Sequence, residues 1–221
     1  MRRWSPTDVR PLGIFGGTFD PVHHGHLRTA LEIAEAVDAE QVLMIPAGRP
    51  PHRRPPVADG ETRLALLRAA IAGEPRLVAD DRELRREGPS FTVLTLEELR
   101  RECGSRPLLL LLGMDAFAGL AGWYRWTELI GLAHLVVAHR PGWAPPAGGA
   151  VGELWRECGS HDPAVVAGAA AGRVLAVPTT QLDISASGLR EMLARGRDPR
   201  YLMPEAVRRM IHETGIYART R

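Results

Sequence analysis

Three histidines lie within four residues near the start of the chain, shortly after an apolar run that ends in two glycines. The glycines are Gly16 and Gly17, and the outer two histidines are His23 and His26. Paired glycines let the backbone approach a phosphate closely, and a helix that begins near Gly25 would direct unsatisfied N–H groups and a partial positive charge at it. A single histidine at such a place usually only caps the helix. A cluster of three after an apolar run and a glycine pair instead predicts a phosphate site, because two rings spaced three residues apart can face one anion.

The segments that would position this motif alternate between apolar strands and amphipathic helices. Strands are predicted at 12–17, 41–46, 107–112, 134–138 and 174–177, and helices at 27–37, 62–72, 91–101, 187–194 and 204–213. The pattern predicts an α/β fold with a Rossmann-like, doubly wound parallel sheet and a small C-terminal helical portion. Ligands of such sheets bind beyond the carboxyl ends of the strands. We expect residues 1–11 to be an N-terminal extension and residues 12–221 to form a single domain.

Two stretches rich in proline or glycine are predicted to be loops. The first, residues 47–60, holds four prolines and three arginines and is basic enough to be a phosphate lid. The second covers 141–149. Residues 151–172 are compatible with irregular helix.

The composition excludes several kinds of chemistry. All 28 basic residues are arginines, so a Walker lysine, a Schiff base and a lysine nucleophile are ruled out. With 26 acidic residues the net charge is only +2, which does not favour a nucleic-acid partner. The two cysteines, Cys103 and Cys158, stand in no C-x-x-C pair, so neither a disulfide framework nor a zinc site is expected. We find no signal peptide or membrane-spanning run and expect a cytoplasmic protein. The sequence does not decide between a monomer and a homo-oligomer.

The first motif, G-G-T-F-D-P-V-H-H-G-H, resembles the signature of the nucleotidylyltransferase superfamily and specifically its bacterial nicotinate mononucleotide adenylyltransferase branch. Further segments are similar to that branch in the same order: P-P-H-R at 50–53, G-P-S-F-T at 88–92, G-M-D at 113–115, W-Y-R-W at 123–126, R-P-G at 140–142 and I-S-A-S-G-L-R at 184–190. Seven ordered matches are far more specific than any single one. Departures are Gly188 in place of a bulkier residue, arginine rather than lysine at Arg53, about ten additional N-terminal residues, and the unmatched stretch 141–172.

The resemblance implies adenylyl transfer from ATP to nicotinate mononucleotide, which yields nicotinate adenine dinucleotide and pyrophosphate in NAD biosynthesis. A mononucleotide phosphate is nearly a dianion at pH 7, so in-line attack needs no general base and no covalent intermediate. His23 and His26 would contact the ATP phosphates, with His26 as the transition-state donor, and Arg190 would hold the β- and γ-phosphates. Few acids stand near the motifs, so Mg²⁺ would be held mainly by phosphate and water rather than by protein ligands.

The resemblance also implies which other residues contact each substrate. For ATP they are Gly16, Gly17, Thr18, Phe19, Gly25, Gly113, Asp115, Ile184, Ser185 and Ser187. For the mononucleotide they are His52, Arg53, Thr92, Trp123, Tyr124 and Arg140.

Some of these residues also allow a purely structural interpretation. Asp115 would accept hydrogen bonds from the AMP ribose, or else cap the helix that follows. Trp123 would stack on the pyridine ring, or else belong to the core. Backbone amides near Thr92 and Tyr124 would bind the nicotinate carboxylate.

Three alternative functions share parts of this pattern. Adenylyltransferases for nicotinamide mononucleotide or phosphopantetheine share the first and last motifs but generally lack the P-P-H-R loop together with the Trp-Tyr segment. A class I aminoacyl-tRNA synthetase fragment needs a K-M-S-K loop, which a chain without lysine does not have. A non-catalytic nucleotide sensor on the same fold would be distinguished by a pyrophosphate-release assay.

Overall fold

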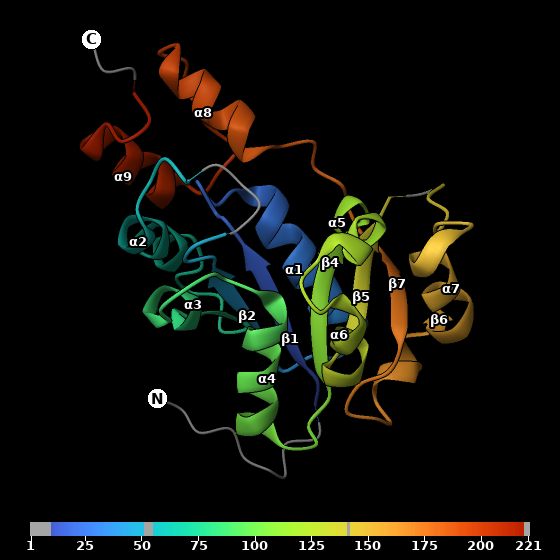
Figure 1. Ribbon diagram of the computed structural model, residues 1–221. Coiled ribbons are helices and arrows are strands. Elements are labelled where there is room, and N and C mark those ends of the chain that lie inside the picture. The colour runs from blue at the N-terminus through green and yellow to red at the C-terminus, as the bar shows by residue number, and fades with distance from the viewer. Residues whose placement is uncertain (1–9, 51–54, 141, 219–221) are drawn as a thin grey trace.

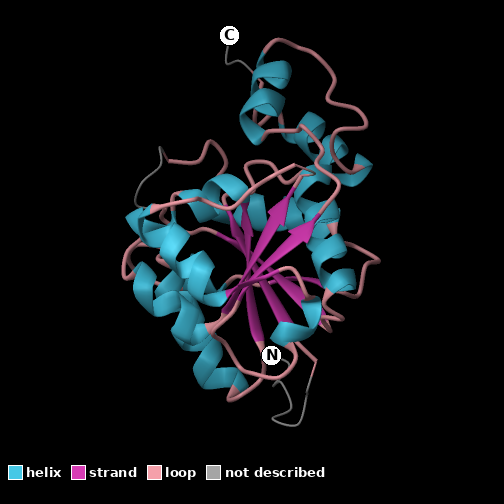
Figure 2. Ribbon diagram, turned by 90° about the vertical axis from the view of Figure 1, so that its right-hand side faces the viewer, coloured by secondary structure: helices cyan, strands magenta, loops and turns pink. Residues whose placement is uncertain are grey.

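A seven-stranded parallel sheet forms the middle layer of the molecule (Figure 2). The computed structural model describes residues 10–50, 55–140 and 142–218. The strands are β1 (Leu12–Gly17), β2 (Gln41–Pro46), β3 (Leu77–Ala79), β4 (Leu108–Gly113), β5 (His134–His139), β6 (Gly159–Ser160) and β7 (Val174–Pro178). Their order across the sheet is β3-β2-β1-β4-β5-β7-β6, and every pair is parallel. The predicted doubly wound α/β fold is therefore confirmed.

Helices cover both faces of the sheet, and each face has its own hydrophobic core. One core receives side chains from α1 (His24–Ala36), α2 (Gly60–Ala70), α8 (Ala186–Ala194), α9 (Glu205–Thr214) and the short helix η2 (Pro163–Val166). The other receives them from α4 (Thr92–Cys103), α5 (Met114–Ala118), η1 (Leu120–Gly122), α6 (Trp126–Leu132) and α7 (Gly149–Cys158). The short α3 (Arg82–Arg85) follows β3.

The continuous apolar sequence of β4 follows from this double burial. Leu109 and Leu111 face one core, whereas Leu108, Leu110 and Leu112 face the other. Successive side chains of a strand point to opposite faces, so a strand covered on both sides needs apolar residues at every position.

The chain reverses its winding direction between β1 and β4. It runs from β1 outward through β2 to β3, then returns to form β4. Figure 1 shows β2 and β4 on opposite sides of β1. The loops that leave neighbouring strands diverge at such a switch point and open a crevice beyond the carboxyl ends of the strands. The fold therefore directs the Gly16-Gly17 turn into the place where a ligand would bind.

The observed elements differ from the predicted ones mainly at short segments. All five predicted strands are present, and α5 corresponds to the helix expected at Asp115. The strands β3 and β6, of three and two residues, were not anticipated, nor were α3, α6 and the 3-10 turns. The first helix begins at His24, close to the start expected near Gly25 and ahead of the periodic apolar stretch 27–37, so the motif histidines lie at its very start. The predicted loop 141–149 ends where the regular helix α7 begins, and α7 also occupies the first part of 151–172. No helix in the described ranges is long and apolar enough to cross a membrane.

Candidate active site

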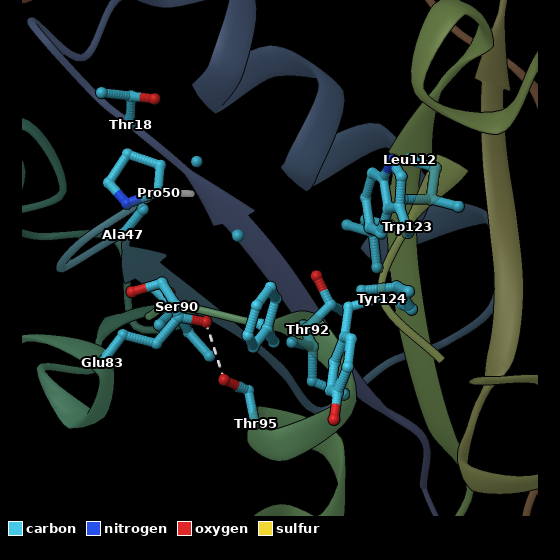
Figure 3. Close-up of a pocket in the computed structure, with 17 residues that line it drawn as sticks. Thr18, Ala47, Pro50, Glu83, Ser90, Thr92, Thr95, Leu112, Trp123 and Tyr124 are labelled. Atoms are coloured by element: carbon cyan, nitrogen blue, oxygen red, sulfur yellow. Dashed lines mark hydrogen bonds between the residues drawn. The ribbon is translucent and has the colours of Figure 1, made fainter. Parts of the chain in front are cut away.

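A cavity of about 250 Å³ opens at the switch point between β1 and β4. Its walls come from the ends of β1, β2 and β4, from the start of α4, and from the segment after η1. Trp123 and Tyr124 lie on one side of it, Ala47 and Ser90 on the other, and Thr92 between them (Figure 3). Parts of four predicted motifs thus meet around one cavity.

Trp123 is half-buried and lines this cavity, so it is not a fully enclosed core residue. The Tyr124 ring is half exposed and packs against the ring of Phe91, with 4.3 Å between ring centroids. Thr92 is the first residue of α4. The first-turn N–H groups of a helix lack intrahelical acceptors, so this end of α4 offers donors to an anionic group in the cavity.

The histidines of the first motif are stacked on each other rather than spread around a common centre. His23 is the N-cap of α1, and its ring lies 3.7 Å, centroid to centroid, from that of His26. The His26 Nδ1 atom accepts a hydrogen bond from the backbone N–H of His23 at 3.3 Å. An imidazole that accepts at Nδ1 carries its proton on Nε2 when neutral, so His26 presents an N–H donor on its far side.

Both histidines are electrically neutral at neutral pH. Burial, with a smaller contribution from its neighbour His24, lowers the pKa of His23 to about 4. Burial, with a smaller contribution from His23, lowers the pKa of His26 to about 3. The two histidines therefore supply neutral N–H groups at neutral pH. Positive charge at this site must come from arginine.

These lowered pKa values predict that acid destabilises the fold. In the unfolded chain both histidines titrate near pH 6.5, so between pH 6.5 and about 4 the unfolded state binds more protons than the folded one. The free energy of unfolding should fall with decreasing pH in this window by up to about 1.4 kcal/mol per pH unit for each histidine.

Urea unfolding at pH 7 and pH 5 measures this change in the free energy of unfolding with pH, and His26→Ala should make the change smaller. The exposed His212→Ala serves as control, and equal slopes in parent and His26→Ala would contradict the expectation.

Two glycines of the motif are required by close packing around these rings. A Cβ atom on Gly17 would lie 2.8 Å from the Phe19 ring, and one on Gly25 would lie 3.0 Å from Nδ1 of His23. Phe19 itself is buried, and its ring meets His26 edge to face at 5.0 Å between centroids. The Phe19 side chain thus packs against the His26 ring and does not face solvent. Gly16 has open space where a Cβ would be and lines the cavity.

Arg190 reaches the same turn from α8, at the other end of the chain. Its Nη1 atom donates to the backbone oxygen of Asp20 and lies 3.6 Å from the Asp20 carboxylate, while its side chain stays 30% exposed. The preceding segment also lies against the start of α1, because a Cβ on Gly25 would be 3.6 Å from the backbone oxygen of Leu182. The first and last motifs are therefore neighbours in space.

The last motif is held in shape by its own serines. Ser185 is the N-cap of α8 and accepts a hydrogen bond from the backbone N–H of Gly188, and Ser187 donates to Ser185 at 3.3 Å. A Cβ on Gly188 would lie 3.0 Å from the Ser185 hydroxyl. Ile184, just before this cap, is half-buried against the core.

Asp115 lies in the first turn of α5, exposed, at the carboxyl end of β4. The N-cap of that helix is Gly113, and no side chain caps it. The interpretation of Asp115 as a helix cap is therefore wrong, and its role toward a ribose stays a prediction.

The remaining positions predicted to contact the mononucleotide are Arg140, His52 and Arg53. Arg140 follows β5 and is exposed, but it does not line the cavity. His52 and Arg53 lie outside the described residues. Thr18, by contrast, lines the cavity, and its backbone oxygen accepts from the buried guanidinium of Arg63 at 2.7 Å.

Several residues that support the site were not identified from the sequence. Arg63 also donates to the backbone oxygen of Ala47 at 2.7 Å, so it joins the turns that follow β1 and β2. The Ser90 hydroxyl accepts from the backbone N–H groups of Gly48 and Arg49. Ser90 and Thr95 both hydrogen-bond the buried carboxyl of Glu83, whose pKa is raised by that burial. The G-P-S-F-T segment contains Ser90 and could have identified it from the sequence. No motif in the sequence pointed to Arg63 or Glu83.

Comparison with known proteins places the chain in a family. A family model described as cytidylyltransferase-like matches residues 14–192. A probable nicotinate-nucleotide adenylyltransferase of Halorhodospira halophila is 47% identical, with 95% of this chain and 96% of that protein covered. One of Aeromonas hydrophila is 45% identical, with 94% and 97% covered. The solved structure of Plasmodium falciparum nicotinic acid mononucleotide adenylyltransferase complexed with NaAD has a TM-score of 0.72 at 13% identity, with 94% of this chain and 97% of that one covered, which supports the fold.

The switch-point crevice, the histidine turn at its edge and the cytidylyltransferase-like match define the protein as a nucleotidyltransferase. Among these enzymes, the chain belongs to the nicotinate-nucleotide adenylyltransferase family. The resemblance detected from seven ordered motifs is thereby confirmed at the level of the family.

Proposed function

We propose that this enzyme transfers the adenylyl group of ATP to nicotinate mononucleotide, releasing pyrophosphate and forming nicotinate adenine dinucleotide for NAD biosynthesis. The observation that carries the proposal is the cavity between Trp123 and the start of α4, which is also lined by the glycine turn that leads to the stacked histidines. Pyrophosphate release from ATP and Mg²⁺, measured with each candidate acceptor in turn, tests it. Turnover only with nicotinamide mononucleotide or phosphopantetheine, or with none of the three, would contradict it.

The cavity suits the pyridine ring and not a whole dinucleotide. Its volume of about 250 Å³ lies below the ~300–1,000 Å³ typical of pockets that enclose a complete drug-sized ligand. The indole of Trp123 offers a stacking face, and the start of α4 offers N–H groups and a partial positive charge for the carboxylate. The phosphates would then lie outside the cavity, along the crevice.

The first and last motifs provide the groups that would meet those phosphates. His26 would donate from Nε2 to an oxygen of the α-phosphate, and His23, stacked on it, fixes its orientation and offers a second donor. Arg190 would supply the positive charge on the side of the departing pyrophosphate. Because the attacking phosphate is already ionised, these residues act by positioning and by stabilising charge.

Mg²⁺ enters with ATP in this proposal. In the described part of the chain no group of three or more His, Cys, Asp or Glu side chains could hold a metal ion. We expect the ion to take its oxygen ligands mainly from the phosphates and water, as is common for Mg²⁺, where it would offset the charge of the triphosphate.

Arg190→Ala should lower kcat/KM for ATP by at least about tenfold, because loss of a charge-assisted hydrogen bond typically costs about 1.5–3 kcal/mol. The exposed Arg195→Ala, at the end of the same helix, is the matched control and should behave as the parent. Steady-state kinetics with ATP varied at saturating mononucleotide measures the effect. If ATP is used equally well by both variants, Arg190 has no place in the site.

A further inference from the structure

The carboxylate of Asp20 lies buried at the junction of four segments that are far apart in sequence. It follows the glycine turn and is only 2% exposed. Its two oxygens accept from the backbone N–H groups of Val57 and Ala58, at 2.8 and 3.1 Å. Arg190 donates to its backbone oxygen and lies 3.6 Å from its carboxylate. A buried charge needs such partners, because desolvation without them is costly.

The remaining partner of this carboxylate comes from the C-terminal end of the chain. The Tyr217 hydroxyl donates to Oδ1 of Asp20 at 2.7 Å, across 197 positions of sequence. Tyr217 is 4% exposed and packs in the same core as α1, α2 and α9. Burial and the bond to Asp20 raise the pKa of its phenol, so it stays a donor throughout the neutral range.

The geometry points to Tyr217 as a positioning residue for ATP, which acts through Asp20 on Arg190. The inference rests on the proposed function and deepens it. The Tyr217 hydroxyl and two backbone N–H groups donate to the Asp20 oxygens and keep the carboxylate in one orientation. The carboxylate then contacts Arg190 through Oδ2, which lies 3.6 Å from Nη1. The rest of the guanidinium stays partly exposed and available to phosphate. Without the hydroxyl, Oδ1 loses one of its two donors and Arg190 becomes the nearest replacement, which draws it away from ATP.

The test is a double-mutant cycle with Tyr217→Phe and Arg190→Ala, because phenylalanine fills the same space without the hydroxyl. We expect Tyr217→Phe to lower kcat/KM for ATP about tenfold, the equivalent of about 1.4 kcal/mol, with KM for nicotinate mononucleotide unchanged. In the Arg190→Ala background the same substitution should have almost no further effect on ATP, because the residue through which it acts is gone. Tyr201→Phe, at an 84% exposed tyrosine, is the control and should match the parent.

Two results would overturn the inference. One is an equal fold-change for Tyr217→Phe in both backgrounds, which a merely structural tyrosine would produce. The other is unchanged use of ATP by Tyr217→Phe. ATP affinity of the four proteins, measured by calorimetry with Mg²⁺ and no acceptor, gives the same cycle independently of turnover. Failure of the parent to use nicotinate mononucleotide would therefore count against the proposed function alone. If Tyr217→Phe folds poorly, Asp20→Asn replaces it in the cycle, because it removes the charge that holds Arg190. Asp20→Asn should lower kcat/KM for ATP in the parent and have almost no further effect in the Arg190→Ala background.

Discussion

Replacing His26 by alanine should lower kcat by at least about 100-fold while leaving the fold intact, the effect expected when one donor aimed at developing charge is removed. The ring is fixed from three sides, by the backbone N–H of His23 on Nδ1, by the stacked ring of His23, and by the nearly perpendicular ring of Phe19. Its proton therefore sits on Nε2 before ATP arrives. Such a preorganised donor does not need to reorient in the transition state, which is why its loss should appear in kcat.

Two companion variants separate donation from packing. His26→Gln keeps a side-chain N–H near the Nε2 position and should recover part of the lost kcat. His24→Ala removes the histidine that the stack does not include and should stay within a few-fold of the parent. Turnover of His26→Ala close to that of the parent, with circular dichroism and Tm confirming a folded protein, would remove His26 from the chemistry.

The parts of the fold that the sequence predicted are those in which one local pattern determines the outcome. The apolar run 107–112 predicted a strand, which is observed as β4 (Leu108–Gly113). The alternation of such runs with amphipathic helices predicted a parallel, doubly wound sheet. Short elements such as β3 were missed because three residues carry no readable period. Helix α7 was expected only as irregular helix within 151–172, because its glycine-rich start resembles the loop before it.

The candidate site was predicted where its residues are adjacent in sequence, and missed where they meet only in space. The glycine turn and its histidines form one local motif, whereas the link from Asp20 to Tyr217 spans almost the whole chain. The electrostatic state of the site was also beyond the sequence. Histidines at a helix start can be cationic or neutral. It is mainly burial that makes these two neutral, with a smaller contribution from His24 for His23 and from His23 for His26.

Nicotinate mononucleotide should be used with at least about 100-fold higher kcat/KM than nicotinamide mononucleotide, since sites that leave a mismatched polar group unpaired can discriminate by up to about 10⁴-fold. The two substrates differ only in a carboxylate against an amide, so shape alone cannot separate them. The end of the cavity at Thr92 is the start of the twelve-residue helix α4, where N–H donors and a partial positive charge would face a bound carboxylate. A carboxylate satisfies these donors through both oxygens. An amide brings its own NH₂ group against one of them and gains nothing from the charge.

Steady-state kinetics with both mononucleotides at saturating ATP measures this selectivity, and Trp123→Ala separates the two contributions to binding. Stacking on the indole does not depend on the charge of the ring substituent, so loss of Trp123 should weaken both substrates by a similar factor and leave their ratio unchanged. A changed ratio would mean that Trp123 reads the carboxylate directly. Comparable kcat/KM for the two mononucleotides in the parent enzyme would refute recognition of the carboxylate by the start of α4, while adenylyl transfer itself would still stand.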